Sequence, residues 1–327
     1  MNRKSIKTFV FLCLVFLFLG ISIIPAYGWN SHGETLSYVL KDSETWLNNY
    51  NNITVTEYSY SDVDKEPYGP NFKLQYLDGK IGENTTAYKI LTTYADEPDW
   101  DLDTGLSLSK LQVLTGGSQG FRHQYYGLGF IRIGAGPERA QYWFNLAEIA
   151  HNRGDDYWTF RFLARALHHI EDLTQPYHGV PAPIGIILKN IKSISTLTNI
   201  ATNHHYNLEE YQGQMIAMGN PSWIEVLEQN TSLPVEPDKL KSIKWLGEYA
   251  ADISRNRVRV LWPLETQFFG ENVNKGNEIW YYDKNTIVFA PQGSVQAKYD
   301  ESVFWSLKNF ASFSRLTLEY AKLKMGL

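Results

Sequence analysis

Residues Asp155–Gly179 read DDYWTFRFLARALHHIEDLTQPYHG and combine a helical pattern with an abrupt end. Apolar and aromatic side chains recur at helical spacing after two acids, which are favourable at a helix N-terminus. Pro176 has no amide hydrogen and disfavours helix at Gln175, so we expect the chain to turn there. The stretch therefore predicts a buried helix, with three histidines and two acidic residues at its C-terminal end and in the turn that follows.

The spacing of these titratable residues is that of a metal site. His168 and Asp172 are four apart, which places both on one helix face, in reach of one metal ion. His178 follows from the turn and completes the pattern H-x3-D-x5-H. In NHHYNLEEY, His205 and Glu209 repeat the four-residue spacing. Taken singly, each of these residues also fits an ordinary core histidine or surface ion pair.

Helical patterning dominates the remainder of the chain. Further helices are predicted in WNSHGETLSYVLKDSETWL, PERAQYWFNLAEIAHNRGD, SIKWLGEYAADISRNRVRVLW and ESVFWSLKNFASFSRLTLEYAKLKM. Residues 51–85 are typical of a polar loop, and 266–299 of an excursion with the short β-like runs EIWYY and TIVFA, compatible with a hairpin. We therefore predict an all-α fold, one multi-helix domain over residues 29–327, with loop and hairpin insertions.

The first 28 residues have the features of a secretory signal peptide. MNRKSIK is basic, TFVFLCLVFLFLGISII is apolar, and PAYG supplies small residues for cleavage after Gly28. The mature chain would begin at Trp29 and be secreted. It would lack the only cysteine, Cys13, and so any thiolate ligand or disulfide. An uncleaved segment would instead anchor the protein in a membrane.

Composition restricts the function further. Loss of Arg3, Lys4 and Lys7 with the signal takes the formal net charge from −5 to −8, which argues against nonspecific binding of duplex DNA. Aromatic residues make up 14% of the chain, which argues against global disorder. Imidazoles and carboxylates, without a mature thiol, form a ligand set that suits zinc.

More of this ligand set lies upstream, in GWNSHGE, YADEPDWDLD and FRHQYYG. With it, the chain resembles the bacterial zinc-dependent phospholipases C and the related fungal and plant single-strand-specific nucleases. The family pattern runs Trp, His, Asp, His, H-x3-D-x5-H and H-x3-E or H-x3-D. It is matched in order by Trp29, His32, Asp96, His123, His168, Asp172, His178, His205 and Glu209.

This resemblance implies a cluster of three Zn²⁺ ions in an all-α fold. The implied ligands are Asp96, His123, His168 and Asp172 for one ion; His178, His205 and Glu209 for a second; and the amino group and carbonyl of Trp29, with His32 and a bridging Asp172, for the third. Such a cluster favours a phosphate diester and activates water for in-line attack on phosphorus. Asp96 is then our candidate to orient or deprotonate that water.

Two features depart from the family. Asp96 is preferred because YAD matches the family string, but Asp99, Asp101 and Asp103 lie in the same loop. The 27-residue step from Asp96 to His123 implies a loop insertion, and HQYYG replaces the more common HFYD.

The expected substrate is a phospholipid, with a membrane surface as the partner and no protein partner implied. Single-stranded nucleic acid is the alternative, because both families share the site chemistry; Glu209 favours the phospholipases, since the nucleases more often have Asp there. A secreted zinc-binding protein without catalysis is a third interpretation. Residues 180–201 fit either a covering helix or an apolar lip that meets lipid.

Overall fold

The computed structural model describes residues 31–41, 45–190, 192–229, 232–282 and 293–327. The predicted signal peptide and Trp29 lie outside the described residues.

The described chain is predominantly helical, as predicted. The α-helices are α2 (His32–Leu40), α3 (Ala87–Tyr94), α4 (Ser118–His123), α5 (Gly136–Asn152), α6 (Asp156–Leu173), α7 (Pro176–Gly179), α8 (Ile184–Asn190), α9 (Ile194–Ala217), α10 (Pro221–Glu228), α11 (Ile243–Ser254), α12 (Val258–Phe269) and α14 (Ser294–Met325). Short 3₁₀ helices are η1 (Thr45–Tyr50), η2 (Glu97–Asp99), η3 (Lys110–Thr115), η4 (Pro237–Lys239), η5 (Arg255–Arg257) and η6 (Glu271–Asn274). Two antiparallel strand pairs join β1 (Ile53–Thr54) to β2 (Asn84–Thr85) and β3 (Tyr126–Leu128) to β4 (Ile131–Ile133).

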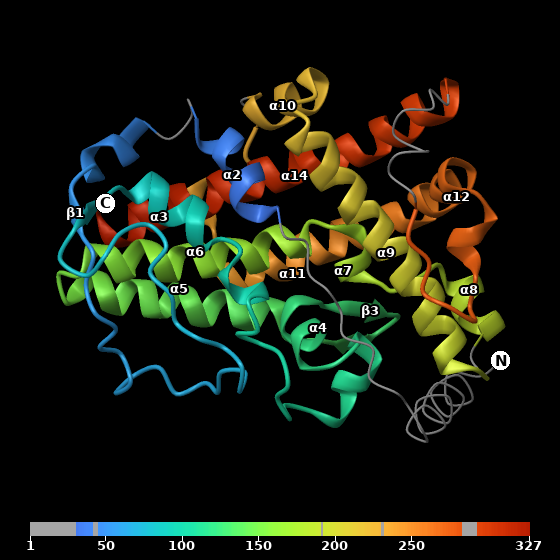
Figure 1. Cartoon of the computed structure of the whole chain (residues 1–327), viewed down its shortest axis with the longest axis horizontal. Coiled ribbons are helices and arrows are strands. Elements are labelled where there is room, and N and C mark those ends of the chain that lie inside the picture. The colour runs from blue at the N-terminus through green and yellow to red at the C-terminus, as the bar shows by residue number, and fades with distance from the viewer. Residues whose placement is uncertain (1–30, 42–44, 191, 230–231, 283–292) are drawn as a thin grey trace.

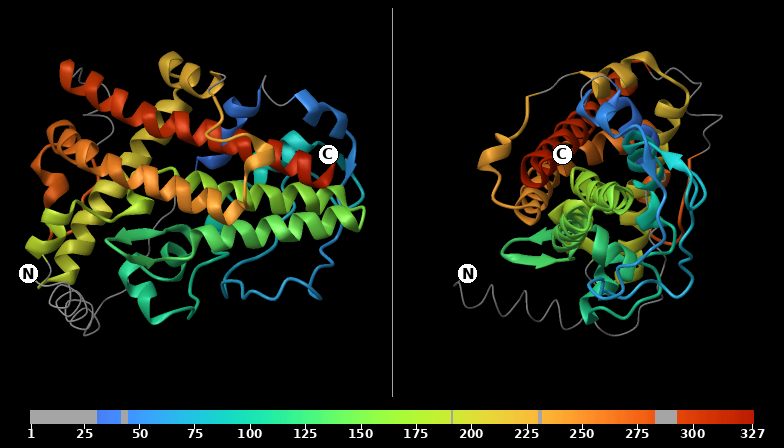
Figure 2. Two further views of the ribbon diagram at one scale, coloured as in Figure 1. Left: turned by 180° about the vertical axis from the view of Figure 1, so that it is seen from behind. Right: turned by 90° about the vertical axis from the view of Figure 1, so that its left-hand side faces the viewer.

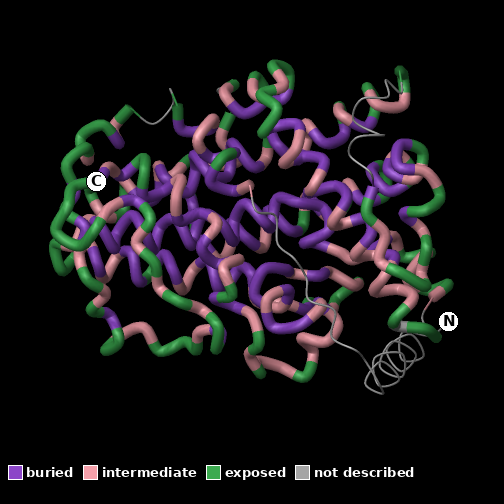
Figure 3. Tube along the Cα trace, viewed as in Figure 1, coloured by how far each residue is buried: buried purple, intermediate pink, exposed green. Residues whose placement is uncertain are grey.

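Helix α6 forms the centre of the molecule. The Asp155 side chain caps it by accepting the Trp158 amide at 3.2 Å, and it ends before Gln175, which is extended as predicted. Every residue from Tyr157 to Leu173 is buried, and Figure 3 shows buried segments through the middle of the molecule. Helices α5, α11 and α14 run beside it along the long axis, and α3 packs across it (Figures 1 and 2).

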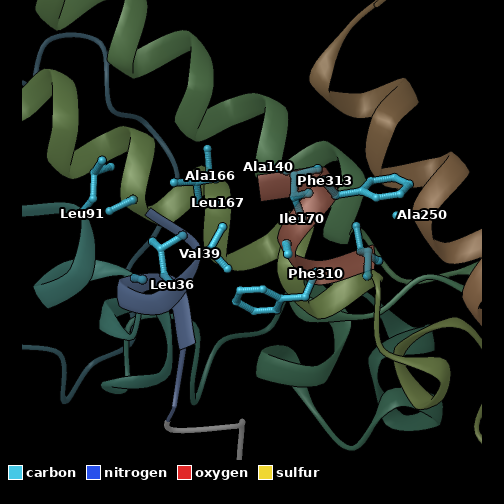
Figure 4. Close-up of a cluster of buried hydrophobic side chains, with 14 of the residues drawn as sticks. Leu36, Val39, Leu91, Ala140, Ala166, Leu167, Ile170, Ala250, Phe310 and Phe313 are labelled. Atoms are coloured by element: carbon cyan, nitrogen blue, oxygen red, sulfur yellow. The ribbon is translucent and has the colours of Figure 1, made fainter. Parts of the chain in front are cut away.

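The apolar core joins α6 to helices from both ends of the chain. Leu36 of α2, Leu91 of α3, Leu167 of α6 and Phe310 of α14 meet there, each 0% exposed (Figure 4). Burying a side chain of this size contributes about 1.5–3 kcal/mol, so this cluster holds the N- and C-terminal helices on α6.

Three segments differ from the sequence predictions. The helix predicted across 29–47 ends at Leu40, and the one across 242–262 divides into α11, η5 and α12. At that division the Ser254 hydroxyl donates to the Leu173 carbonyl at 2.9 Å, a tertiary contact that no local pattern encodes. Residues 278–282 form no strand, because the side-chain amides of Asn203 and Asn207 on α9 hydrogen-bond their backbone. TIVFA lies outside the described residues.

Among the described residues, no helix combines the length and the apolar character needed to cross a membrane.

Candidate metal centre

A first donor group, Asp99, His123, His168 and Asp172, forms where η2, α4 and the end of α6 meet. His123 Nδ1 lies 3.1 Å from His168 Nε2, 2.9 Å from Asp172 Oδ2 and 3.5 Å from Asp99 Oδ1. His168 Nε2 lies 3.4 Å from Asp172 Oδ2 and 3.8 Å from Asp99 Oδ1. Bonds of about 2.0–2.1 Å to a tetrahedral ion put ligand atoms about 3.3 Å apart, so these separations fit such an ion.

A second donor group, His178, His205 and Glu209, lies where α7 meets α9. Glu209 Oε1 is 3.0 Å from His178 Nε2 and 2.8 Å from His205 Nε2. His178 and Glu209 are buried, whereas the His205 side chain remains 15% exposed. The second group is therefore the one that reaches toward solvent.

Asp172 connects the two groups with a fifth histidine, His32. Its Oδ2 faces the first group, while its Oδ1 lies 3.4 Å from His32 Nε2 and 3.6 Å from His178 Nδ1. The structure thus brings His32 of α2 to the carboxylate that the family pattern assigns as a bridge. Trp29, the other predicted ligand there, lies outside the described residues.

The histidine rings are oriented so that lone pairs point inward. The second ring nitrogen of His32 lies 2.9 Å from Glu171 Oε2, that of His168 lies 2.7 Å from the Ala95 carbonyl, and that of His178 lies 3.1 Å from the His123 carbonyl. These oxygens accept, so that nitrogen carries a hydrogen, and in the neutral imidazole Nε2 presents a lone pair to the donor group. Metal-binding histidines are typically held in this way.

Charged neighbours shift the pKa values of residues in both donor groups. Burial alone would lower the pKa of His123, but Asp103 and Asp172 outweigh it and raise that pKa to about 10. Burial would raise the pKa of Glu209, yet His205 and His178 lower it to about 2. Neighbouring charges thus favour the charged forms of both His123 and Glu209. A bound cation would neutralise the carboxylates in place of the protons on the imidazoles.

Three carboxylate oxygens in this region are buried without a hydrogen-bond partner among the described residues: Asp99 Oδ2, Asp103 Oδ2 and Asp172 Oδ1. Burying an unpaired carboxylate oxygen is unfavourable unless a cation or water meets it. Three sets of side chains in this region lie close enough together to hold a metal ion: His123, His168, His169 and Asp172; His32, Asp99 and His168; and His178, His205 and Glu209.

Asp96 is not part of either donor group among the described residues. Its carboxylate accepts the backbone amides of His32 at 2.8 Å and Gly33 at 3.2 Å, and so caps the N-terminus of α2. The structure brings Asp99, three residues later, to His123 and His168 instead. The 3₁₀ turn of η2 separates the two aspartates and aims them at different partners.

Sequence reasoning missed the residues that support the ligands. Glu171 fixes His32 and accepts the Ser314 hydroxyl at 2.9 Å. Asp103 Oδ2 lies 3.3 Å from His123 Nε2, and its other oxygen accepts from Arg122 at 2.6 Å and Arg139 at 2.9 Å. The sequence marks Asp103 only as one of four aspartates in the loop, and nothing local marks Glu171.

Comparison with protein-family models, with curated proteins and with solved structures gave no match. The family resemblance therefore rests on the motif residues alone.

Proposed function

We propose that this chain is a secreted, zinc-dependent phosphoric diester hydrolase of the phospholipase C type, with three ions. The observation that carries the proposal is the meeting of imidazole lone pairs with buried carboxylate oxygens around Asp172. Trp29 would complete the third ion with His32 and Asp172. The predicted signal peptide supports secretion and a free amino group at Trp29.

Zn²⁺ held there would supply positive charge for a phosphate diester and its more negative transition state, and would make water a nucleophile near neutral pH. The residues themselves have distinct parts. Asp172 holds the groups together with its two oxygens. Asp99 takes the part first assigned to Asp96: its Oδ1 accepts from Gln119 at 2.9 Å, which leaves the buried Oδ2 to orient a water or accept its proton.

A single-strand-specific nuclease remains the second candidate, supported by one observation. Tyr281, 50% exposed, packs on Tyr206 with ring centroids 4.3 Å apart, and Tyr206 follows His205 of the second group directly. An exposed aromatic ring beside the metal groups could stack a base.

The test is a hydrolysis assay on the chain beginning at Trp29, with zinc and with chelator. Phosphatidylcholine and single-stranded RNA are offered separately, and phosphocholine and nucleotides are counted. We expect zinc-dependent release of phosphocholine. Release of nucleotides alone would make the protein a nuclease, and bound zinc without cleavage would favour a non-catalytic zinc-binding protein.

Two variants separate the site from its surroundings. Asp172→Asn should abolish hydrolysis, because Asp172 contacts both donor groups and His32. Asp101→Asn is the matched control: Asp101 is exposed, lies in the same loop as Asp99, and has a φ of 65° that Asn tolerates well. Equal losses of hydrolysis in both variants would show that activity depends on the loop and not on the donor group.

A further inference from the structure

The β3–β4 hairpin presents an apolar side chain to solvent at its tip. Two residues, Gly129 and Phe130, connect the strands, and the φ of 64° at Gly129 is one that glycine adopts without strain. Tyr126 and Ile133 are buried and fix the base of the hairpin. Phe130 is 68% exposed, the highest value among the large apolar side chains of the described residues.

Helix α8 adds a second apolar element beside this tip. Ile184 and Leu188 are four apart, hence on one face, and are 57% and 52% exposed. Between the hairpin and α8 lies a groove of about 250 Å³, lined by Leu128, Gly129, Val180, Ile184, Ile187 and Arg259 among others. Figures 1 and 2 place the hairpin and α8 at the end of the molecule away from the C-terminus.

The charges around the groove are mainly positive. Arg255 and Arg259 line it, Arg132 extends from β4 and Lys189 from α8. Asp252 pairs with Arg255 at 2.6 Å and Arg132 at 3.5 Å, whereas Arg259 is exposed and has no ion pair within the described ranges. A basic rim on a chain of formal net charge −5 complements an anionic surface.

This end of the molecule is also connected to the second donor group. Val180 in the groove is two residues beyond His178, which limits the separation of their Cα atoms to about 7 Å. The Tyr125 amide, just before β3, donates to the His178 carbonyl at 2.8 Å. A surface that binds the groove is therefore brought close to the candidate metal centre.

We propose that the hairpin tip and α8 form a docking surface for an anionic phospholipid bilayer. Phe130, Ile184 and Leu188 enter the boundary between head groups and acyl chains, while Arg259 and Lys189 meet lipid phosphates. Exposed apolar side chains with a basic surround are the combination that holds proteins at membrane interfaces. The inference deepens the proposed function by naming where the enzyme meets its substrate, but docking itself needs no catalysis.

Vesicle sedimentation tests this surface directly. The zinc-loaded chain is mixed with vesicles of phosphatidylcholine alone, and with vesicles in which a quarter of the lipid is phosphatidylglycerol. We expect preferential binding to the second kind. Phe130→Ser and Leu188→Ser should each weaken it about tenfold or more. Arg259→Gln should reduce both the preference for phosphatidylglycerol and the sensitivity to salt.

Ile81→Ser is the matched control. Ile81 is 56% exposed in the loop that leads into β2, and β1, the strand that pairs with β2, lies at the opposite end of the molecule from α8 (Figure 1). The change should leave binding as it was. Equal weakening by Ile81→Ser, or no weakening by Phe130→Ser and Leu188→Ser, would overturn the proposal. So would a stable dimer that dissociates on Phe130→Ser, because the patch would then be an interface between copies.

The failure of docking can be told apart from the failure of the proposed function. A soluble diester, bis(p-nitrophenyl) phosphate, reports the metal centre without a membrane. Hydrolysis of this ester by Phe130→Ser at the wild-type rate, with slower hydrolysis of vesicles, supports docking. Vesicle binding that depends on Phe130, without hydrolysis of any diester, would support the docking surface and contradict the proposed enzymatic function.

Discussion

The two parts of α6, before His168 and from His168 onward, are equally buried and both carry charge, yet they are built differently. In the part of α6 before His168, Arg161 and Arg165 meet one carboxylate, Glu97, and Arg161 also lies over the Tyr94 ring at 3.7 Å. In the C-terminal part, His168 faces the ring nitrogen of His123, and Asp172 faces that of His32. Burial of charge alone therefore does not mark a functional site. The first part pairs cations with an anion, whereas the second gathers groups that an added cation would join.

The largest expected effect on stability comes from removing the carboxylate that pairs with Arg161 and Arg165 of α6. Glu97→Gln leaves two buried guanidinium groups without their counter-charge, and we expect the free energy of unfolding to fall by about 3–5 kcal/mol. The fall should be the same with zinc and with chelator, as measured by urea denaturation. Asp172→Asn should instead remove chiefly the zinc-dependent part of stability. If Glu97→Gln abolishes only the zinc-dependent stability, the two parts of α6 are not different in kind.

A smaller effect distinguishes the two aspartates of the loop. Asp99→Asn should lose the ion of the first donor group, counted as bound zinc per chain. Asp96→Ala should keep all of the zinc and lower the free energy of unfolding by about 1 kcal/mol, because the cap of α2 is lost. The reverse pattern, with zinc lost only from Asp96→Ala, would restore the assignment made from the YAD string.

The smallest effect concerns a residue that acts through another. Glu171→Gln keeps the size of the side chain but removes the charge behind His32, so affinity for one ion should fall about tenfold. Competition with a fluorescent zinc chelator measures this affinity. Ser314→Ala removes only one hydrogen bond to Glu171 and should change the affinity less. Equal affinities in Glu171→Gln and the unmodified chain would show that His32 needs no such support.

The sequence predicts the place of the candidate site better than the identity of each residue in it. Four-residue spacing and Pro176 were sufficient to predict α6, its end and the placement of His168, Asp172 and His178. Asp96 could not be separated from Asp99, because both are acids in one loop and their targets lie on α2 and α4. The cap that Asp96 provides joins residues 63 and 64 positions apart, a relation that no local pattern contains.

Helix boundaries show the same limit. The helix over 136–152 begins with Pro137 in its first turn and ends before Gly154, and local signals predicted both. The division after Ser254 depends on its bond to Leu173, and the irregular path of 278–282 depends on two asparagines of α9. Local chemistry determined the first boundary, and tertiary partners determined the other two.

The long sequence separations around Asp172 bear on when the protein matures. His32 reaches Glu171 across 139 residues, and Ser314 reaches it across 143. Contacts of such high order form late in folding, because the intervening chain must first be ordered. A newly made chain would therefore acquire tight metal affinity only near the end of folding, so metal retention would report that both ends of the polypeptide have docked on α6.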